Sequence, residues 1–269
     1  MNLSYLLPRL ARRFMPEPLV RFLLLRGWVI QAGTETFYPQ QAVGRYEDAL
    51  AELGESLSEK RVMVFGYGGR FDIALALLDA GAAHVVLVDK FAPPDHVHNL
   101  GLLPSYRRYL DRKGNTVIPR PEAITLIQDD IREVEVEAVD IVLSNSVYEH
   151  LDDVEGITAS LAKFTNPGGI HVHFIDLRDH FFKYPFEMLR FSETTWTRWL
   201  NPSSHHNRYR LWEYRRVFEA CFSQVNIDIL AREEAAFLKL KPHIRPEFIS
   251  ENLEEDAAAL IRVIAKKGE

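Results

Sequence analysis

The stretch that decides the fold is residues 61–89, which read RVMVFGYGGRFDIALALLDAGAAHVVLVD. It opens with an apolar run of β type, Arg61–Phe65, and closes with a second one, His84–Val88. A glycine-rich loop and a helical stretch at 71–80 lie between them, and Gly81 is a plausible helix stop. This order predicts two parallel strands that are joined by a crossover helix.

The loop and the acid after the second strand predict a site for a nucleoside. Gly66, Gly68 and Gly69 carry no side chain, so a ligand can approach their backbone N–H groups. Asp89 follows about 20 residues later, where a carboxylate can accept hydrogen bonds from the hydroxyls of a ribose. NAD, FAD and S-adenosylmethionine all fit such a unit. Phe71 stands where the dinucleotide pattern has its last glycine, which suits a cofactor without phosphates better.

The rest of the chain continues the alternation of strands and helices. Further strands are predicted at 124–128, 139–143, 170–175, 225–230 and 260–265, and helices at 46–57, 105–110, 154–164 and 211–221. The sequence NPGG at 166–169 predicts a turn. We therefore expect an α/β fold with a doubly wound, mostly parallel, seven-stranded Rossmann-like sheet, helices on both faces and an N-terminal helical cap. The cap is expected over 1–58 and the Rossmann-like domain over 59–269, with a substrate-covering insertion at about 180–216.

Composition and charge exclude several classes of protein. The chain has 269 residues, 47% hydrophobic and 26% charged, which is ordinary for a globular protein. Its single cysteine, Cys221, excludes an internal disulfide and a CxxC metal site, and it favours a reducing, cytoplasmic location. The net charge of −6 argues against a general nucleic-acid binder. No apolar run reaches the roughly 18 residues that a membrane span needs.

The N-terminal segment is basic and amphipathic. Apolar residues recur at helical spacing from Leu3 to Phe14, with Arg9, Arg12 and Arg13 on the other side of the expected helix. We expect a helical cap that packs on the domain or covers its active site. The alternative is a helix that makes peripheral contact with a membrane surface.

Two later segments resemble class I, Rossmann-like S-adenosylmethionine-dependent methyltransferases. One is VDIVLSNSVYEHL at 139–151, and the other is the helix and turn that lead to Pro167, Gly168 and Gly169 before a strand. With the glycine loop and Asp89, the resemblance spans about 61–175, close to the whole Rossmann core. It implies S-adenosyl-L-methionine as the cofactor and methyl transfer as the reaction.

The resemblance also implies a set of cofactor-binding residues. They are Gly66, Tyr67, Gly68, Gly69, Asp89, Lys90, Asp129, Asp130, Ile131, Ser144 and Asn145. The glycine loop would line the methionine part and the ribose, and Asp89 would bind the ribose hydroxyls. Asp130 would accept from the adenine amino group while Ile131 packs on the ring. Ser144 and Asn145 would lie near the methionine part.

One position departs from the family pattern. Two residues before the first glycine the family has Asp or Glu, which helps to hold the amino end of the cofactor, and this chain has Val64. Three explanations stay open: another group compensates, the cofactor binds more weakly, or the fold serves without methyl transfer.

Candidate catalytic and acceptor-binding residues follow the fourth and fifth strands, because ligands bind beyond the carboxyl ends of parallel strands. A histidine titrates near neutral pH and suits a general base. The catalytic candidates are His180, His150 and Glu149, and the acceptor-binding candidates are Asp176, Arg178, Asp179, His205, His206 and Arg208. His171 and His173 alternate along a strand and are expected to pack. No dense spacing motif supports a metal site, so none is expected.

These patterns favour methyl transfer to a small-molecule acceptor. Aromatic and arginine side chains at 184–216 suit a saccharide or another natural-product intermediate, with oxygen as the accepting atom. The alternatives are a methyltransferase fold that binds or catalyses something else, an RNA methyltransferase, which the acidic charge disfavours, and an NAD-dependent oxidoreductase.

Overall fold

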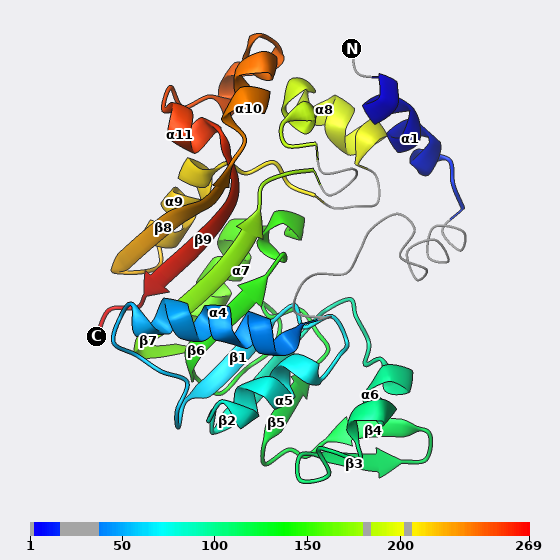
Figure 1. The fold of residues 1–269 in the computed structure, drawn as a ribbon, viewed down its shortest axis with the longest axis vertical. Coiled ribbons are helices and arrows are strands. Elements are labelled where there is room, and N and C mark those ends of the chain that lie inside the picture. Colours follow the sequence, from blue (N-terminus) through cyan, green and yellow to red (C-terminus); the bar gives the residue numbers. More distant parts are fainter. Residues whose placement is uncertain (1–2, 17–37, 180–183, 202–205) are drawn as a thin grey trace.

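The computed structural model describes residues 3–16, 38–179, 184–201 and 206–269 (Figure 1). Seven strands form one sheet in the order β5-β2-β1-β6-β7-β9-β8. Their bounds are β1 Arg61–Phe65, β2 His84–Val88, β5 Ile124–Ile127, β6 Val139–Asn145, β7 Thr165–Asp176, β8 Gln224–Arg232 and β9 Ala258–Lys266. All pairs are parallel except those of β9, which runs antiparallel to β7 and β8. The predicted doubly wound, mostly parallel, seven-stranded sheet is confirmed.

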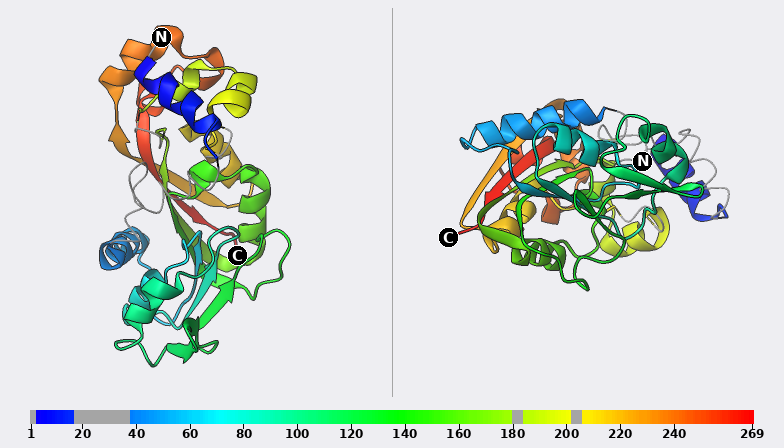
Figure 2. Two further views of the ribbon diagram at one scale, coloured as in Figure 1. Left: turned by 90° about the vertical axis from the view of Figure 1, so that its right-hand side faces the viewer. Right: turned by 90° about the horizontal axis from the view of Figure 1, so that it is seen from below.

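Helices cover both faces of the sheet because its central strands are apolar on both sides. Val62 and Val64 of β1 point to the face that is covered by α4 (Pro39–Ala51) and α5 (Asp72–Asp79). Met63 and Phe65 point to the opposite face, where α7 (Val154–Lys163) and α9 (Leu211–Glu219) pack. Figures 1 and 2 show α4 and α7 on opposite sides of the sheet.

A third apolar cluster holds a helical layer at one end of the molecule. It joins Phe186, Met188, Trp196, Phe237 and Phe248, with leucines of α1 packed on it. Its short elements are α1 Leu3–Arg13, η2 Glu187–Arg190, α8 Glu193–Thr195, η3 Trp196–Leu200, α10 Glu234–Leu240, η4 Lys241–His243, η5 Pro246–Phe248 and α11 Leu253–Asp256. Segments from both ends and the middle of the chain thus lie side by side there (Figure 2).

The expected orientation of α1 was wrong. Its arginines were expected to lie opposite the packed side, but Arg9 is 3% exposed, whereas Leu7 and Phe14 are 61% and 73% exposed. Arg9 is buried because it pairs with Asp179 and lies over the ring of Trp196. Peripheral membrane contact through this helix stays a prediction. Within the described residues, no helix is long and apolar enough to cross a membrane.

Three predictions of local structure also need correction. The helix expected at 105–110 is absent; α6 lies earlier, at His96–Leu102, and a hairpin of β3 (Leu110–Lys113) and β4 (Thr116–Pro119) follows. The helix expected at 46–57 is α4, which begins earlier because a proline suits the first turn of a helix. The expected NPGG turn is an irregularity inside β7, where the register with β6 shifts.

α4 shares its core cluster with β1 and α5, and the division at residue 58 between a cap and a Rossmann-like domain stays a prediction.

Candidate active site

Three glycines shape the loop between β1 and α5. Gly66, Gly68 and Gly69 have φ angles of +79°, +71° and +84°, which residues with a Cβ rarely adopt. A Cβ on Gly66 would lie 2.4 Å from Val147, and one on Gly69 would lie 2.4 Å from the carbonyl oxygen of Pro93. Nothing lies within 4 Å of a Cβ built on Gly68. The loop is therefore packed against its neighbours at Gly66 and Gly69, and open space lies beside the Cα of Gly68.

Asp89 fixes this loop from the end of β2. Its Oδ2 accepts a hydrogen bond from the Gly68 N–H at 3.0 Å, and its Oδ1 accepts from the N–H groups of Phe91 and Ala92 at 2.9 and 2.8 Å. A carboxylate offers about four acceptor positions, so capacity remains for a ligand hydroxyl. Backbone donors thus hold Asp89 where the sequence predicted a ribose.

A pocket of about 270 Å³ opens at the carboxyl ends of β1, β2, β5 and β6. Of the predicted cofactor residues, it is lined by Gly66, Asp89, Lys90, Asp129, Asp130 and Ile131. Tyr67, Gly68, Gly69, Ser144 and Asn145 lie outside its lining. The residues that sequence reasoning missed are Phe65, Arg132, Ser146, Val147, Leu151, Asp152, Asp153 and Ile157. Most of the missed residues lie in the β6–α7 connection. The only feature of the sequence that could have indicated them is that this connection follows the end of a predicted strand.

Cations occupy both oxygens of the Asp130 carboxylate. Oδ1 accepts from Arg132 Nε at 2.9 Å, and Oδ2 accepts from Lys90 Nζ at 3.0 Å and Arg132 Nη2 at 2.5 Å. The guanidinium holds the pKa of Asp130 well below its usual range, although burial opposes this. Asp130 therefore stays ionised, and its role toward an adenine stays a prediction. Ile131 beside it is buried and lends the pocket an apolar wall.

The turn after β6 adopts a strained backbone at the pocket. Ser146 has a φ angle of +56°, which is uncommon for a residue with a Cβ and is often found at functional sites. Its N–H donates to the carbonyl oxygen of Phe174 at 2.9 Å. This bond turns the chain from β6 into η1 (Tyr148–His150), which brings His150 to the pocket wall.

Ser144 begins a chain of hydrogen bonds through the core on the α7–α9 face. Thr165 Oγ1 donates to the carbonyl oxygen of Leu161 at 2.7 Å, so it accepts from His171 Nε2 at 2.7 Å. His171 Nδ1 then accepts from His173 Nε2 at 3.2 Å, and His173 Nδ1 accepts from the Ser144 hydroxyl at 2.7 Å. Burial lowers the pKa of His173 to about 3 and that of His171 well below its ordinary value. Both imidazoles are therefore neutral, and the only proton of the Ser144 hydroxyl points into the core.

Comparison with known proteins supports the fold. Residues 71–173 match a family model described as a methyltransferase domain. The matched segment runs from the start of α5 to the middle of β7, so a large part of the Rossmann-like core is similar to a methyltransferase domain. No curated protein sequence matches the chain.

Solved structures share the fold of this methyltransferase at low sequence identity. A protein from Galdieria sulphuraria, named as a candidate sarcosine dimethylglycine methyltransferase, has 15% identity and a TM-score of 0.53, over 83% of this chain and 86% of that chain. The YcgJ protein from Bacillus subtilis has 14% identity and a TM-score of 0.51, over 85% and 99%. Phosphoethanolamine N-methyltransferase 2 from Haemonchus contortus, in complex with S-adenosyl-L-methionine, has 14% identity and a TM-score of 0.53, over 84% and 53%.

The catalytic candidates of this methyltransferase have different surroundings. His150 lines the 270 Å³ pocket, and its ring lies 5.4 Å from that of His206. Glu149 is 1% exposed, and its Oε1 accepts from the N–H of Asp176 at 3.4 Å, so it braces the end of β7. His180 lies outside the described residues. His150 is thus the catalytic candidate that the structure places at the pocket.

The acceptor-binding candidates form internal contacts. Arg178 pairs with Asp176 at 2.8 Å. Asp179 is fully buried and pairs with Arg9, while Tyr5 also donates to it. These roles stay predictions, as does that of His205, which lies outside the described residues.

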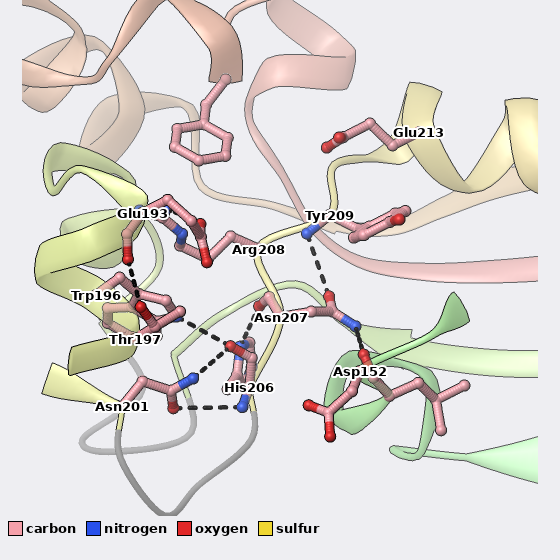
Figure 3. Close-up of a pocket in the computed structure, with 12 residues that line it drawn as sticks. Asp152, Glu193, Trp196, Thr197, Asn201, His206, Asn207, Arg208, Tyr209 and Glu213 are labelled. Atoms are coloured by element: carbon pink, nitrogen blue, oxygen red, sulfur yellow. Dashed lines mark hydrogen bonds and ion pairs between the residues drawn. The ribbon is translucent and has the colours of Figure 1, made fainter. Parts of the chain in front are cut away.

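A second cavity of about 420 Å³ lies between the helical layer and the methyltransferase core (Figure 3). His206 and Arg208 line it, and Leu151 and Asp152 line both this cavity and the first pocket. The Arg208 guanidinium already bonds to the protein, because it donates to Glu193 at 2.5 Å and to the carbonyl oxygen of Met188 at 3.1 Å. His206 and Arg208 thus line a cavity that adjoins the pocket, and their role toward an acceptor stays a prediction.

Metal ligands are absent from the described part of the chain. Among these residues, no group of three or more His, Cys, Asp or Glu side chains is arranged to hold a metal ion. The one cysteine, Cys221, is half-buried and free, and burial raises the pKa of its thiol.

Proposed function

We propose that this methyltransferase binds S-adenosylmethionine in the 270 Å³ pocket and methylates a small-molecule acceptor. The observation that carries the proposal is the Asp89 carboxylate, which three backbone N–H groups hold at the pocket edge beside an open glycine loop. The related fold of an enzyme solved with S-adenosyl-L-methionine supports the same assignment.

The pocket residues suit an adenosine. Asp89 would accept from the ribose hydroxyls, and Ile131 would pack against the adenine ring with Phe91 and Lys90 beside it. Bound there, the cofactor supplies an activated methyl group on a sulfonium. The protein must then orient the acceptor, exclude water and accept a proton from a hydroxyl acceptor.

We place the proton acceptor at His150, and the accepting atom is an oxygen of a saccharide or another natural-product intermediate. His150 borders the pocket from the β6–α7 connection, which is the region beyond a strand end where a doubly wound sheet binds ligands. Polar and aromatic side chains in the adjoining region, such as Asn207 and Tyr209, suit the hydroxyl-rich faces of such a molecule.

Calorimetry with S-adenosylmethionine and S-adenosylhomocysteine tests the cofactor assignment. We expect both to bind in the micromolar range, roughly −8 kcal/mol. Incubation of the enzyme with S-adenosylmethionine and pools of hydroxylated metabolites, followed by mass spectrometry, tests the acceptor: a product heavier by one methyl-for-hydrogen replacement is expected. Absence of heat with both ligands would contradict the proposal.

A further inference from the structure

One row of residues crosses the sheet at the level of the glycine loop. Asn145 of β6 is the register partner of Phe174 of β7, which in turn pairs with Arg262 of β9. The pairing of Val64 with Leu143, continued by two residues, places Gly66 level with Asn145. Register partners point to the same face, so the side chains of Asn145 and Phe174 share the face of α4 and α5. Two strand spacings, roughly 10 Å, separate Gly66 from Phe174.

Arg45 of α4 lies over this row, and two of its guanidinium nitrogens have no hydrogen-bond partner among the residues that the structure describes. The Arg45 guanidinium lies 4.6 Å from the centre of the Phe174 ring. Its Nε and Nη2 atoms are buried and form no hydrogen bond. Arg262, its neighbour on the same face, is fully paired by comparison, with Asp228 and Glu52 at 2.7 Å each. Within the described residues no carboxylate is paired with Arg45.

A second buried donor without a partner belongs to the glycine loop itself. Tyr67 is 5% exposed, and its hydroxyl is buried with no hydrogen-bond partner. Its ring packs in the same core cluster as Phe174. Buried polar groups in native proteins are almost always satisfied, and a group that is not satisfied needs an explanation such as a missing ligand.

These hydrogen-bond donors have no acidic side chain of the protein beside them at the position where the family carries one. The position where related enzymes carry an acid is Val64, whose side chain is fully buried in the sheet. A guanidinium, a phenol and an amide all donate hydrogen bonds, and a guanidinium is suited to hold a carboxylate by two parallel bonds. We infer that Arg45, Tyr67 and Asn145 hold the carboxylate of the amino-acid part of the cofactor. This chain thus binds the carboxylate of the amino-acid part. In the family pattern, an Asp or Glu of the protein binds the amino group of that part instead.

The inference rests on the proposed function, and binding measurements separate the two. The probes are S-adenosylhomocysteine and 5′-methylthioadenosine, which has the nucleoside and the thioether but no amino-acid part. We expect Arg45→Met to weaken S-adenosylhomocysteine roughly 10- to 100-fold, because a charge-assisted contact is lost, and to leave 5′-methylthioadenosine unchanged. Tyr67→Phe, which removes a single hydroxyl, should weaken S-adenosylhomocysteine roughly 2- to 10-fold with the same selectivity.

Two variants control for charge and for loss of a hydroxyl. Arg112→Met removes one positive charge from the exposed β3–β4 hairpin, and Tyr106→Phe removes a hydroxyl that bonds to Asp79. Both should bind the two probes as the wild type does. Thermal unfolding checks that Arg45→Met folds, and Tyr67→Phe repeats the test with a smaller change.

The outcomes are distinct. Failure of the wild type to bind S-adenosylhomocysteine would overturn the proposed function and the carboxylate site with it. Wild-type affinity for S-adenosylhomocysteine in Arg45→Met would overturn the carboxylate site alone. Equal losses for both probes would also overturn it, because the variant would then disturb the whole pocket rather than one contact.

Discussion

Asp89 joins two parts of the candidate site through one side chain. Its carboxylate accepts from the glycine loop on one side and from the two N–H groups after β2 on the other. Charged acceptors make hydrogen bonds that are roughly twice as strong as neutral ones. The residue therefore orders the loop and presents a negative charge to the pocket with the same two oxygens.

Asp89→Asn should weaken S-adenosylhomocysteine binding by roughly 10- to 100-fold, because the ribose loses a charged acceptor and an amide cannot satisfy donors on both sides. Isothermal titration calorimetry measures this. Asp79→Asn is the matched control, since its carboxylate pairs with Arg108 on the surface, away from the pocket. Equal effects of the two substitutions would contradict a specific role for Asp89.

His171 and His173 tie stability to pH. Both are fully buried and neutral, and burial holds the pKa of His173 at about 3, below the ordinary value of 6.5. In the unfolded chain these imidazoles bind a proton near pH 6.5, whereas in the folded chain they stay neutral at that pH. Their contribution to the free energy of unfolding is therefore complete above pH 6.5 and is lost as the pH falls toward 3.

As the pH falls from 6.5 to 4, each of these histidines should lower the free energy of unfolding by about 1.4 kcal/mol for every pH unit. Urea unfolding of the wild type and of His173→Asn, measured over this range, isolates one histidine as the difference between the two slopes. The variant should show the shallower dependence on pH. Parallel curves would mean that His173 is already protonated in the folded protein.

At the scale of elements, a buried arginine joins the start of α9 to the start of β9. Arg210 precedes α9, is fully buried, and donates to the carbonyl oxygens of Asp256 and Ala258 at 3.0 and 2.9 Å. Burial lowers the pKa of its guanidinium to about 10, so it stays protonated at neutral pH. The helix start and the α11–β9 connection are thus joined by one side chain.

Arg210→Met should destabilise the protein by about 2–4 kcal/mol, because it leaves buried carbonyl groups without donors. Arg215→Met is the control; its partner, Glu255, lies at 2.9 Å near the surface, and such a pair contributes about 0–1 kcal/mol. Denaturant titration of both variants gives the comparison. A loss below 1 kcal/mol for Arg210→Met would show that the carbonyl groups find other donors.

At the scale of the whole molecule, a buried ion pair fastens the N-terminal helix to the end of the parallel sheet. Arg9 of α1 pairs with Asp179, which follows β7, and Tyr5 donates to the same carboxylate. The Arg9 guanidinium also lies 4.6 Å from the Trp196 ring of the helical layer. Three segments far apart in sequence therefore meet at one charge pair.

Arg9→Met should release α1, because removing one partner of a buried pair costs about 3–5 kcal/mol. Hydrogen exchange read by mass spectrometry should show faster exchange in peptides of α1 and little change in the central strands. The double variant Arg9→Met, Asp179→Asn also removes the charge of the Asp179 carboxylate, which the single variant leaves unpaired. It should restore most of the protection of α1 against hydrogen exchange. A double variant as exposed as the single one would contradict the pairing argument.

Local patterns in the sequence predicted the sheet well and the short elements poorly. The strands of the core are continuous apolar runs, which appear in the sequence whatever surrounds them. The β3–β4 hairpin was missed because its strands are only four residues long and half of their residues are polar, although Gly114 and Asn115 form a dipeptide that is typical of tight hairpin turns. The helix expected at 105–110 is absent, and the nearest helix, α6, ends at Leu102, shortly before Pro104, which cannot continue it.

By itself the sequence determined where the core strands, the glycine loop and Asp89 lie along the chain, because each depends on neighbours within about 30 residues, the length of one strand–helix–strand unit. Only the tertiary structure decided which polar residues are satisfied and which are not. It paired Asp179 with Arg9 and directed the Ser144 hydroxyl toward His173. Within the described residues it left Nε and Nη2 of Arg45 and the hydroxyl of Tyr67 without hydrogen-bond partners. Those outcomes depend on contacts between distant segments, and burial makes each of them energetically decisive.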